Sequence, residues 1–100
     1  MKKYKIVITP TAQKDIQTGK DWHETKQDLL GNDFIDAIES ALIRIHSNPR
    51  IFSLIYKGIR RALVKRFPFG IYYFIKDDII NIFAVIHFSR NPKIWKKRTK

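Results

Sequence analysis

The first half of the chain contains one short apolar run followed by a segment with helical periodicity. Residues 4–9, YKIVIT, are rich in β-branched side chains and end at Pro10, which predicts a strand. Thr9 or Thr11 can cap the helix that follows, because proline is tolerated in a first helical turn. Apolar or small residues then recur three or four positions apart, which predicts an amphipathic helix over roughly residues 11–29.

A second helix is predicted after Gly31-Asn32, a pair that breaks the first one. Asn32 or Asp33 can cap this second helix. The apolar positions between residues 34 and 45 form one stripe, and Asn48-Pro49 ends the segment. Because the break between the two helices is short, we expect them to form an antiparallel hairpin.

The second half of the chain changes to strand-like segments. Residues 58–67, 71–75 and 79–88 are β-branched and aromatic, and the breaks between them are short. Short breaks favour an antiparallel meander. The predicted order is β-α-α-β-β-β in a single α+β domain spanning residues 1–100. We expect the helix hairpin to pack on one face of an antiparallel sheet, followed by a short basic C-terminal helix or tail.

Alternation along the last strand predicts which face of the sheet is covered. One set of alternate positions, from Ile80 to Phe88, is wholly apolar and is expected to lie under the helices. The other set is mixed and ends at His87, which predicts that this histidine points to the face opposite the helices. Lys65 or Arg66 from the neighbouring strand, and Arg90 beyond the strand end, could converge with it there.

Charge adds a strong asymmetry to this picture. The chain of 100 residues has a formal net charge of +11; residues 1–50 carry eight Lys or Arg and seven Asp or Glu, whereas residues 51–100 carry twelve against two. Such a field attracts polyanions, which favours nucleic acid or an acidic protein as the partner over a merely solubilising surface. No cysteine is present and no apolar run is long enough for a membrane helix or a signal peptide, so we expect a soluble, cytoplasmic protein.

The candidate functional residues come mainly from this basic half. His87 and Arg90 are candidate functional residues, although a histidine at a strand end can equally be structural. Pro68 and Trp95 are expected to be structural anchors. His23 and His46 have no third ligand in view, so no metal and no cofactor are expected. The candidate target- or nucleic-acid-binding residues are Arg61, Lys65, Arg66, Arg90, Lys93, Lys96, Lys97 and Arg98.

Two segments of the second half resemble the RelE/ParE superfamily of type II toxins. They are RRALVKRFPFGIYYFI (60–75) and INIFAVIHFSRNPKIWKKR (80–98), with a Phe-Pro-aromatic turn in the first and His-x-x-Arg-x-Pro-x-x-Trp in the second. The resemblance covers essentially the whole chain and is strongest to the ParE-like branch. It implies a growth-inhibiting toxin of a plasmid-stabilising system, held inactive in a hetero-oligomer with an acidic antitoxin, and with DNA gyrase as its target.

The resemblance leaves other functions open, including whether the protein is an enzyme. RelE-like members cleave messenger RNA on the ribosome, which requires an acid/base and cations near the phosphate. If this chain is such a nuclease, His87 and Arg90 are its candidate catalytic residues. Arg90 falls where these enzymes keep an arginine, but Gly70 or Ile71 falls where they carry another, and Trp95 where they carry a tyrosine. These departures favour the ParE-like, non-hydrolytic mode. A non-catalytic nucleic-acid-binding module or an inactive toxin are further alternatives.

Overall fold

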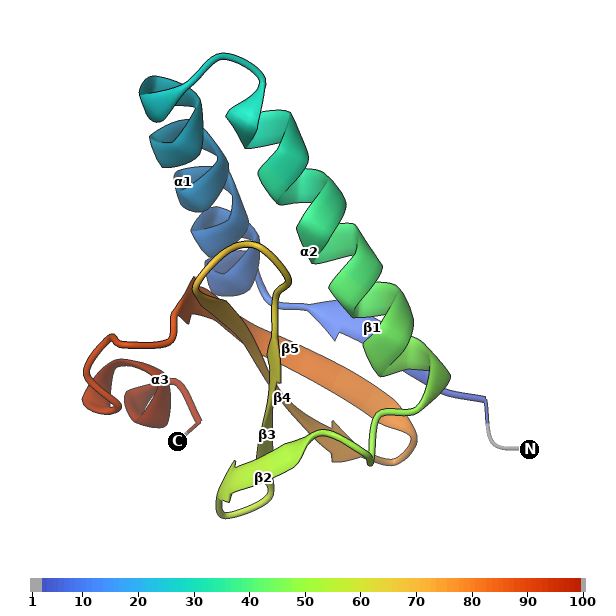
Figure 1. Ribbon diagram of the computed structural model, residues 1–100. Coiled ribbons are helices and arrows are strands. Elements are labelled where there is room, and N and C mark those ends of the chain that lie inside the picture. Colours follow the sequence, from blue (N-terminus) through green and yellow to red (C-terminus); the bar gives the residue numbers. More distant parts are fainter. Residues whose placement is uncertain (1–2, 100) are drawn as a thin grey trace.

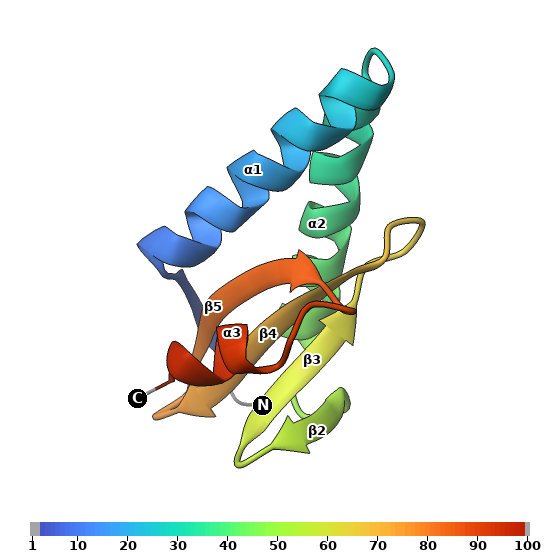
Figure 2. The same ribbon diagram turned by 90° about the vertical axis from the view of Figure 1, so that its left-hand side faces the viewer.

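The chain forms one five-stranded sheet with two long helices on one face and a short helix on the other (Figures 1 and 2). The computed structural model describes residues 3–99, and the last residue of the predicted basic tail, Lys100, lies outside them. The strand order is β1-β5-β4-β3-β2. The elements are β1 (Lys5–Ile8), α1 (Pro10–Lys26), α2 (Leu30–Ser47), β2 (Ser53–Tyr56), β3 (Ile59–Leu63), β4 (Phe69–Lys76), β5 (Ile79–His87) and α3 (Lys93–Lys97). The predicted α+β class, helix hairpin and C-terminal meander are confirmed.

Two details of the predicted sheet are wrong. The first strand pairs parallel to the last, with Lys5 opposite Ile79 and Ile8 opposite Ile82, so the sheet is mixed and not purely antiparallel. Parallel neighbours need a long crossover connection, and the helix hairpin supplies part of it. The second error is the omission of β2, which pairs antiparallel with β3 at the sheet edge. Its four residues are too few to show a clear alternation in the sequence. The pairing also shifts register between Leu54 and Tyr56, which weakens the pattern further.

Each long helix begins with a different capping arrangement. Thr9 caps α1 as predicted, because its Oγ1 accepts a hydrogen bond of 3.1 Å from the backbone N–H of Ala12. The predicted start of α2 is wrong, since Gly31 and Asn32 lie inside its first turn. A side chain from the other helix takes the place of the expected cap: the Glu24 carboxylate accepts from the N–H groups of Leu29 at 3.0 Å and Gly31 at 2.9 Å.

The main core lies between the helix hairpin and the sheet. Phe34, Ile38 and Ile45 of α2 pack against the strand residues Ile71, Tyr73, Ile80 and Ile82, all of them buried. Burial of this apolar area is the main stabilising contribution to the fold. Tyr73 is the one member of this group with a polar atom, and its hydroxyl donates a hydrogen bond of 2.7 Å to the carbonyl of Pro49.

The Tyr73 hydroxyl makes stability sensitive to alkaline pH. Burial raises the pKa of Tyr73 from 10.0 to about 12, although the nearby charge of Arg60 acts in the opposite direction. As the pH rises, Tyr73 therefore loses its proton at a lower pH in the unfolded chain than in the folded chain. Stability from this group is complete below pH 10 and is lost as the pH rises towards 12.

We expect Tyr73→Phe to lower the free energy of unfolding by about 1 kcal/mol at neutral pH, through loss of the bond to Pro49. The variant should also lose less stability than the parent between pH 10 and 12. Chemical denaturation of both proteins across this range measures both effects. Parallel pH profiles for the two proteins would contradict the assignment to Tyr73.

Candidate functional site

A β-bulge in β5 determines which side chains face the helices near the strand end. Tyr72 pairs with Ala84 while Tyr73 pairs with Ile82, so Phe83 is an extra residue in β5. Ile80, Ile82 and Val85 belong to the core under the helices, whereas Phe83, Ala84 and Ile86 belong to a second apolar cluster with Trp95 on the opposite face. The predicted strict alternation is therefore wrong beyond Ile82. Because alternate residues of a strand face the same side of the sheet, His87 lies with Val85 on the side of the helices.

The Asp15 carboxylate of α1 and the guanidinium of Arg98 hold the bulge in place. The backbone N–H of Val85 donates to Asp15 Oδ2 at 3.0 Å, and Arg98 Nη1 donates to the same oxygen at 2.6 Å and to the carbonyl of Phe83 at 3.2 Å. Their side chains are only 14% and 23% exposed. Arg98 was expected to bind a target, but this largely buried ion pair makes it an internal link between α1, β5 and the end of α3.

His87 and Arg90 line one cleft between α1 and the end of β5. The cleft has a volume of about 420 Å³, and α1 contributes Thr18, Gly19 and the exposed ring of Trp22 to its wall. Arg90 is exposed and lies in the turn after β5, where its backbone N–H donates to the carbonyl of His87 at 3.0 Å. The cleft therefore combines an exposed cation, a histidine and an accessible aromatic ring.

The hydrogen bonds of His87 define the chemistry of its ring. The backbone N–H of Ser89 donates to His87 Nδ1 at 3.1 Å, and the Ser89 hydroxyl lies 2.7 Å from the same nitrogen. Because Nδ1 accepts from the backbone, Nε2 carries the proton of the neutral ring. In this tautomer the outer nitrogen, Nε2, can donate a hydrogen bond.

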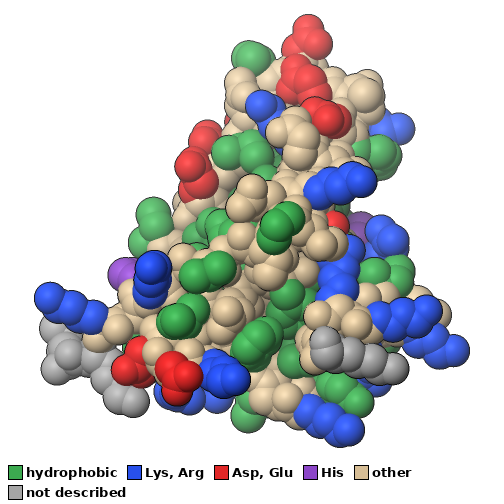
Figure 3. All heavy atoms as spheres, turned by 180° about the vertical axis from the view of Figure 1, so that it is seen from behind, with side chains coloured by type: hydrophobic (Ala, Val, Ile, Leu, Met, Phe, Trp, Pro, Cys, Tyr) green, Lys and Arg blue, Asp and Glu red, His purple; other side chains and the backbone are tan. Residues whose placement is uncertain are grey.

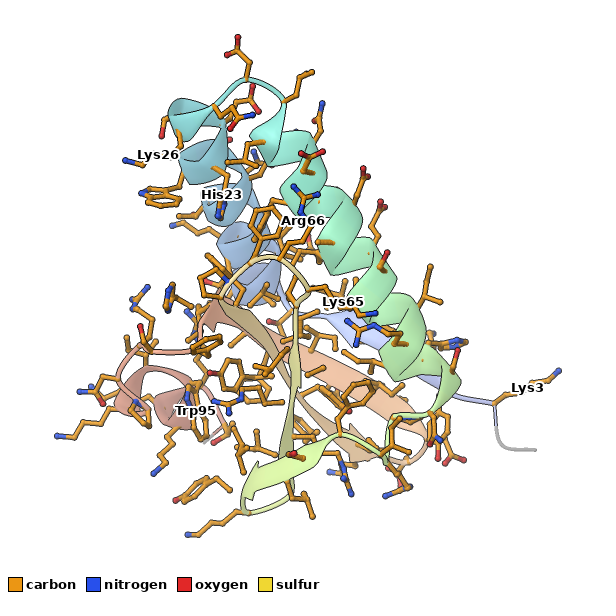
Figure 4. All side chains as sticks on the ribbon, in the orientation of Figure 1. Lys3, His23, Lys26, Lys65, Arg66 and Trp95 are labelled. Atoms are coloured by element: carbon orange, nitrogen blue, oxygen red, sulfur yellow. The ribbon has the colours of Figure 1, made fainter. Side chains whose placement is uncertain are left out.

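The remaining basic candidates lie apart from this cleft. Arg61 pairs with Tyr72 across β3 and β4 and lies on the opposite face of the sheet, where its side chain passes within 2.9 Å of the position of a Cβ on Gly70. Lys65 and Arg66 follow β3 and lie beside α2 (Figure 4), where Arg66 pairs with Asp33 at 3.6 Å. The predicted convergence of Lys65 or Arg66 with His87 and Arg90 on one open face is wrong, because the β3–β4 loop bends towards the helices.

The face opposite the helix hairpin is covered by α3. Trp95 is only 6% exposed and stacks on Tyr72 with ring centroids 5.3 Å apart, and Figure 4 shows it between α3 and the sheet. Tyr56 meets the same indole edge-on at 5.9 Å. Pro68, the other expected anchor, is exposed, and its carbonyl accepts a bond of 3.0 Å from the Phe88 N–H. This face was expected to be open; instead, Trp95 closes its centre.

Lysines surround the groove that α3 leaves beside the sheet. Lys93, Lys96 and Lys97 of α3 line it together with Lys57 from the β2–β3 turn and Lys76 at the end of β4. The volume of this groove is about 730 Å³. Its lining shares no residue with the cleft that contains His87 and Arg90. The predicted basic surface is thus divided into separate sites.

Acidic and basic side chains are segregated along the molecule. Seven of the nine acids fall between Asp15 and Glu39, within the helix hairpin and its connection. Figure 3 shows most of the visible acidic side chains over the upper, hairpin part of the molecule, a smaller acidic group at its lower edge, and basic side chains mainly over the lower part. A polyanion would therefore be repelled by the hairpin tip and attracted to the sheet and α3.

Sequence reasoning missed Asp15, Trp22, Lys57 and Lys76 as parts of these sites. Asp15 had a detectable signal, because it lies three residues after Ala12 and four before Gly19, on the buried stripe of α1. An acid on such a stripe needs a partner. Lys57 and Lys76 had none, because only the fold brings their two turns close to α3.

Two absences bear on the chemistry of residues 3–99. In this range, no group of three His, Asp or Glu side chains is arranged to hold a metal ion. His23 is buried with its ring stacked on Phe34, and His46 Nε2 lies 2.8 Å from the carbonyl of Tyr4. None of the helices in the described part of the chain is long and apolar enough to cross a membrane.

Comparison with known families identifies one match. The family described as the ParE toxin of the type II toxin-antitoxin system parDE matches residues 6–92. This range begins in β1 and ends in the turn before α3, so it contains the helix hairpin, the meander, His87 and Arg90. A search of curated proteins finds no significant relative.

Solved structures share the fold at low sequence identity. A chain of the chromosomal ParDE system from P. aeruginosa is 14% identical with a TM-score of 0.64, covering 85% of this chain and 96% of its own. A chain of the toxin-antitoxin complex RelBE2 from Mycobacterium tuberculosis is 20% identical with a TM-score of 0.59, covering 86% and 99%. A chain of the DinJ-YafQ toxin-antitoxin complex from E. coli is 14% identical with a TM-score of 0.61, covering 88% and 96%.

Proposed function

The chain belongs to the ParE toxin family of type II toxin-antitoxin systems, and from this premise we propose that it inhibits growth by acting on DNA gyrase. The cleft around Arg90 is the proposed contact surface for this target. Arg90 supplies an exposed cation, the His87 ring supplies a hydrogen-bond donor, and Trp22 supplies an aromatic surface that is 55% exposed. Exposed arginine and tryptophan side chains are frequent energetic centres of protein interfaces. We expect this action to take place in the cytoplasm.

One observation supports a mode of action without hydrolysis: most of the groups that RNA cleavage would need lie apart from one another. His87 and Arg61 lie on opposite faces of the sheet, and Lys65 lies beside α2. Trp95 is buried at the position where RelE-like enzymes carry a tyrosine. Cleavage of a phosphodiester requires an acid/base and cations around one phosphate. This arrangement favours recognition of a target over chemistry on RNA.

A second candidate function, cleavage of messenger RNA, rests on the shared cleft of His87 and Arg90. If the protein were such a nuclease, transcripts mapped after induction would show new 5′ ends at codon positions. These cuts would disappear in a His87→Ala variant, because the other carboxyl or imidazole group among the described lining residues, Asp15, is already bound to the Val85 N–H and to Arg98. Under the gyrase proposal, His87→Ala leaves the pattern of transcript ends unchanged.

The second part of the proposal is neutralisation by a cognate antitoxin with an acidic, amphipathic segment. The chain exposes large apolar side chains beside basic ones, including Val7, Ile43 and Leu54. An acidic segment with an apolar side can match both features. Coexpression with the product of the adjacent reading frame should restore growth, and the two chains should copurify as a hetero-oligomer. Unimpaired growth at high expression of the isolated chain would contradict its action as a toxin.

We expect Arg90→Ala to abolish growth inhibition while the melting temperature stays within a few degrees of the parent. An exposed arginine in a turn contributes well under about 1 kcal/mol to stability. The matched control is Arg50→Ala, which removes an exposed arginine between α2 and β2 and outside the cleft. Growth curves after induction and thermal melts of the purified proteins measure the two properties. An Arg90→Ala protein that remains fully toxic would show that the working surface lies elsewhere.

A further inference from the structure

We propose that the lysine groove, formed by Lys57, Lys76, Lys93, Lys96, Lys97 and Phe74, binds the phosphate backbone of single-stranded nucleic acid. This inference goes beyond the proposed action on gyrase and concerns a different part of the molecule. The groove is lined by residues of α3, the β2–β3 turn and the end of β4, and Figure 2 shows α3 in front of the sheet. None of its described lining residues is acidic. Five cations therefore converge on one hollow without an opposing carboxylate in its wall.

Aromatic rings position part of this charge before a ligand arrives. Lys96 Nζ lies 4.3 Å from the centroid of the Tyr56 ring, and Lys57 Nζ lies 5.3 Å from the same centroid. Ammonium groups are attracted to the faces of aromatic rings, which restricts the side chains that carry them. Trp95 in turn fixes α3 against the sheet. Two of the five lysines thus lose less conformational freedom on binding than unrestrained surface lysines would.

The exposed surface of the groove favours a nucleic acid over an acidic helix as its occupant. The described lining contains five lysines and no acid, so the charge of the groove is the main feature that an occupant must match. Tyr56 is only partly buried and adds aromatic surface to the wall. A nucleic acid gains mainly from its charge, since one phosphate per nucleotide can follow lysines from three separate elements. Phe74, which is partly buried, offers a ring for base stacking.

The size of the groove favours a single strand over a duplex. A flexible single strand can bend into a hollow of about 730 Å³, whereas a double helix is stiff over many base pairs and would contact only its rim. Lys76, Lys93 and Lys97 are exposed at its rim and are free to follow the backbone of a flexible strand. Both single-stranded DNA and single-stranded RNA carry this phosphate chemistry. The test below therefore uses both.

The test measures binding of fluorescein-labelled oligothymidylate and oligouridylate, each about 12 nucleotides long, to the purified full-length chain by anisotropy. The groove variant is Lys93→Glu with Lys97→Glu. The control is Lys5→Glu with Lys14→Glu, which makes the same change in net charge with exposed residues outside the groove. We expect the groove variant to bind at least about tenfold more weakly and the control less than about threefold. The plot of the logarithm of the association constant against the logarithm of the salt concentration has a negative slope, and its magnitude should be smaller by about 1.4 in the groove variant.

The outcomes separate the proposal from its alternatives. A larger loss of affinity in the groove variant than in the control, with unchanged melting temperatures, supports binding in the groove. The oligonucleotide that binds more tightly then identifies DNA or RNA as the ligand. Equal loss in both variants would overturn it, because general charge would then explain binding. Tighter binding of a duplex or of a poly-glutamate peptide would also overturn it. Arg90→Ala should bind the oligonucleotides like the parent, so this result is independent of the gyrase proposal.

Discussion

Replacing Trp95 with alanine is expected to lower the free energy of unfolding by about 3–5 kcal/mol. The indole is 6% exposed and packs on Tyr72 and Tyr56, so its removal leaves a cavity that five-residue α3 cannot refill. A loss of about 3 kcal/mol corresponds to a fall in melting temperature on the order of 15 °C for a domain of this size. Toxicity should decline only as far as the folded fraction declines.

Trp22→Ala is the matched control for this experiment, because Trp22 is the other tryptophan of the chain and is 55% exposed. Its removal should change stability by about 0.5 kcal/mol or less. Chemical denaturation followed by circular dichroism compares the two variants, and in each of them the remaining tryptophan reports fluorescence from a single place. Equal destabilisation by both substitutions would show that Trp95 is not the anchor of α3.

Replacing Asp15 with alanine is expected to lower the free energy of unfolding by about 3 kcal/mol. The change removes the acceptor of the buried Val85 N–H and leaves the Arg98 guanidinium, which is 23% exposed, without its counter-ion. A buried donor and a buried charge without partners are both costly. Because the same carboxylate holds the bulge of β5, hydrogen exchange should increase most at the end of that strand.

Two further variants identify the origin of the Asp15 effect. Asp33→Ala breaks the pair with Arg66, whose side chains are 46% and 64% exposed, and should change stability by less than about 1 kcal/mol. In a double-mutant cycle of Asp15→Ala with Arg98→Ala, the two losses should be non-additive by about 1–3 kcal/mol. Additive losses would mean that Asp15 and Arg98 act independently, against the short contact of 2.6 Å between them.

Periodicity predicted the fold well because most of the chain follows simple rules. The stripe from Phe34 to Ile45 and the capping by Thr9 depend on neighbours along the chain, and both are present. The start of α2 was mispredicted because Glu24, on the other helix, supplies the cap. A cap from another element leaves no sign in the segment that it stabilises.

The candidate site was harder to predict because a single extra residue reverses the facing of a strand. The insertion of Phe83 moves His87 to the helix side and leaves Arg61 on the other. No sequence signal in IINIFAVIHF marks this bulge, since every residue around it is apolar. Its determinants, Asp15 and Arg98, lie 70 and 15 residues away from the backbone groups that they bind.

Charge predicted a basic surface, but it did not predict that this surface is divided into separate sites. Composition alone locates the excess of Lys and Arg in the second half. Only the tertiary structure shows that Arg98 forms an internal ion pair with Asp15 and that Arg66 pairs with Asp33. It also shows that Lys57 and Lys76 line the lysine groove together with α3. These placements depend on contacts between distant segments, which a charge count does not contain.

DNA gyrase is the proposed target of the protein, and the cleft of His87 and Arg90 is the proposed contact surface. The most direct measurement is DNA supercoiling by purified gyrase, with the chain added in increasing amounts and the products separated by gel electrophoresis. We predict that supercoiling decreases and cleaved DNA accumulates with the parent chain, and that Arg90→Ala has neither effect while Arg50→Ala retains both. Undiminished supercoiling at a large molar excess of folded parent chain would contradict the claim.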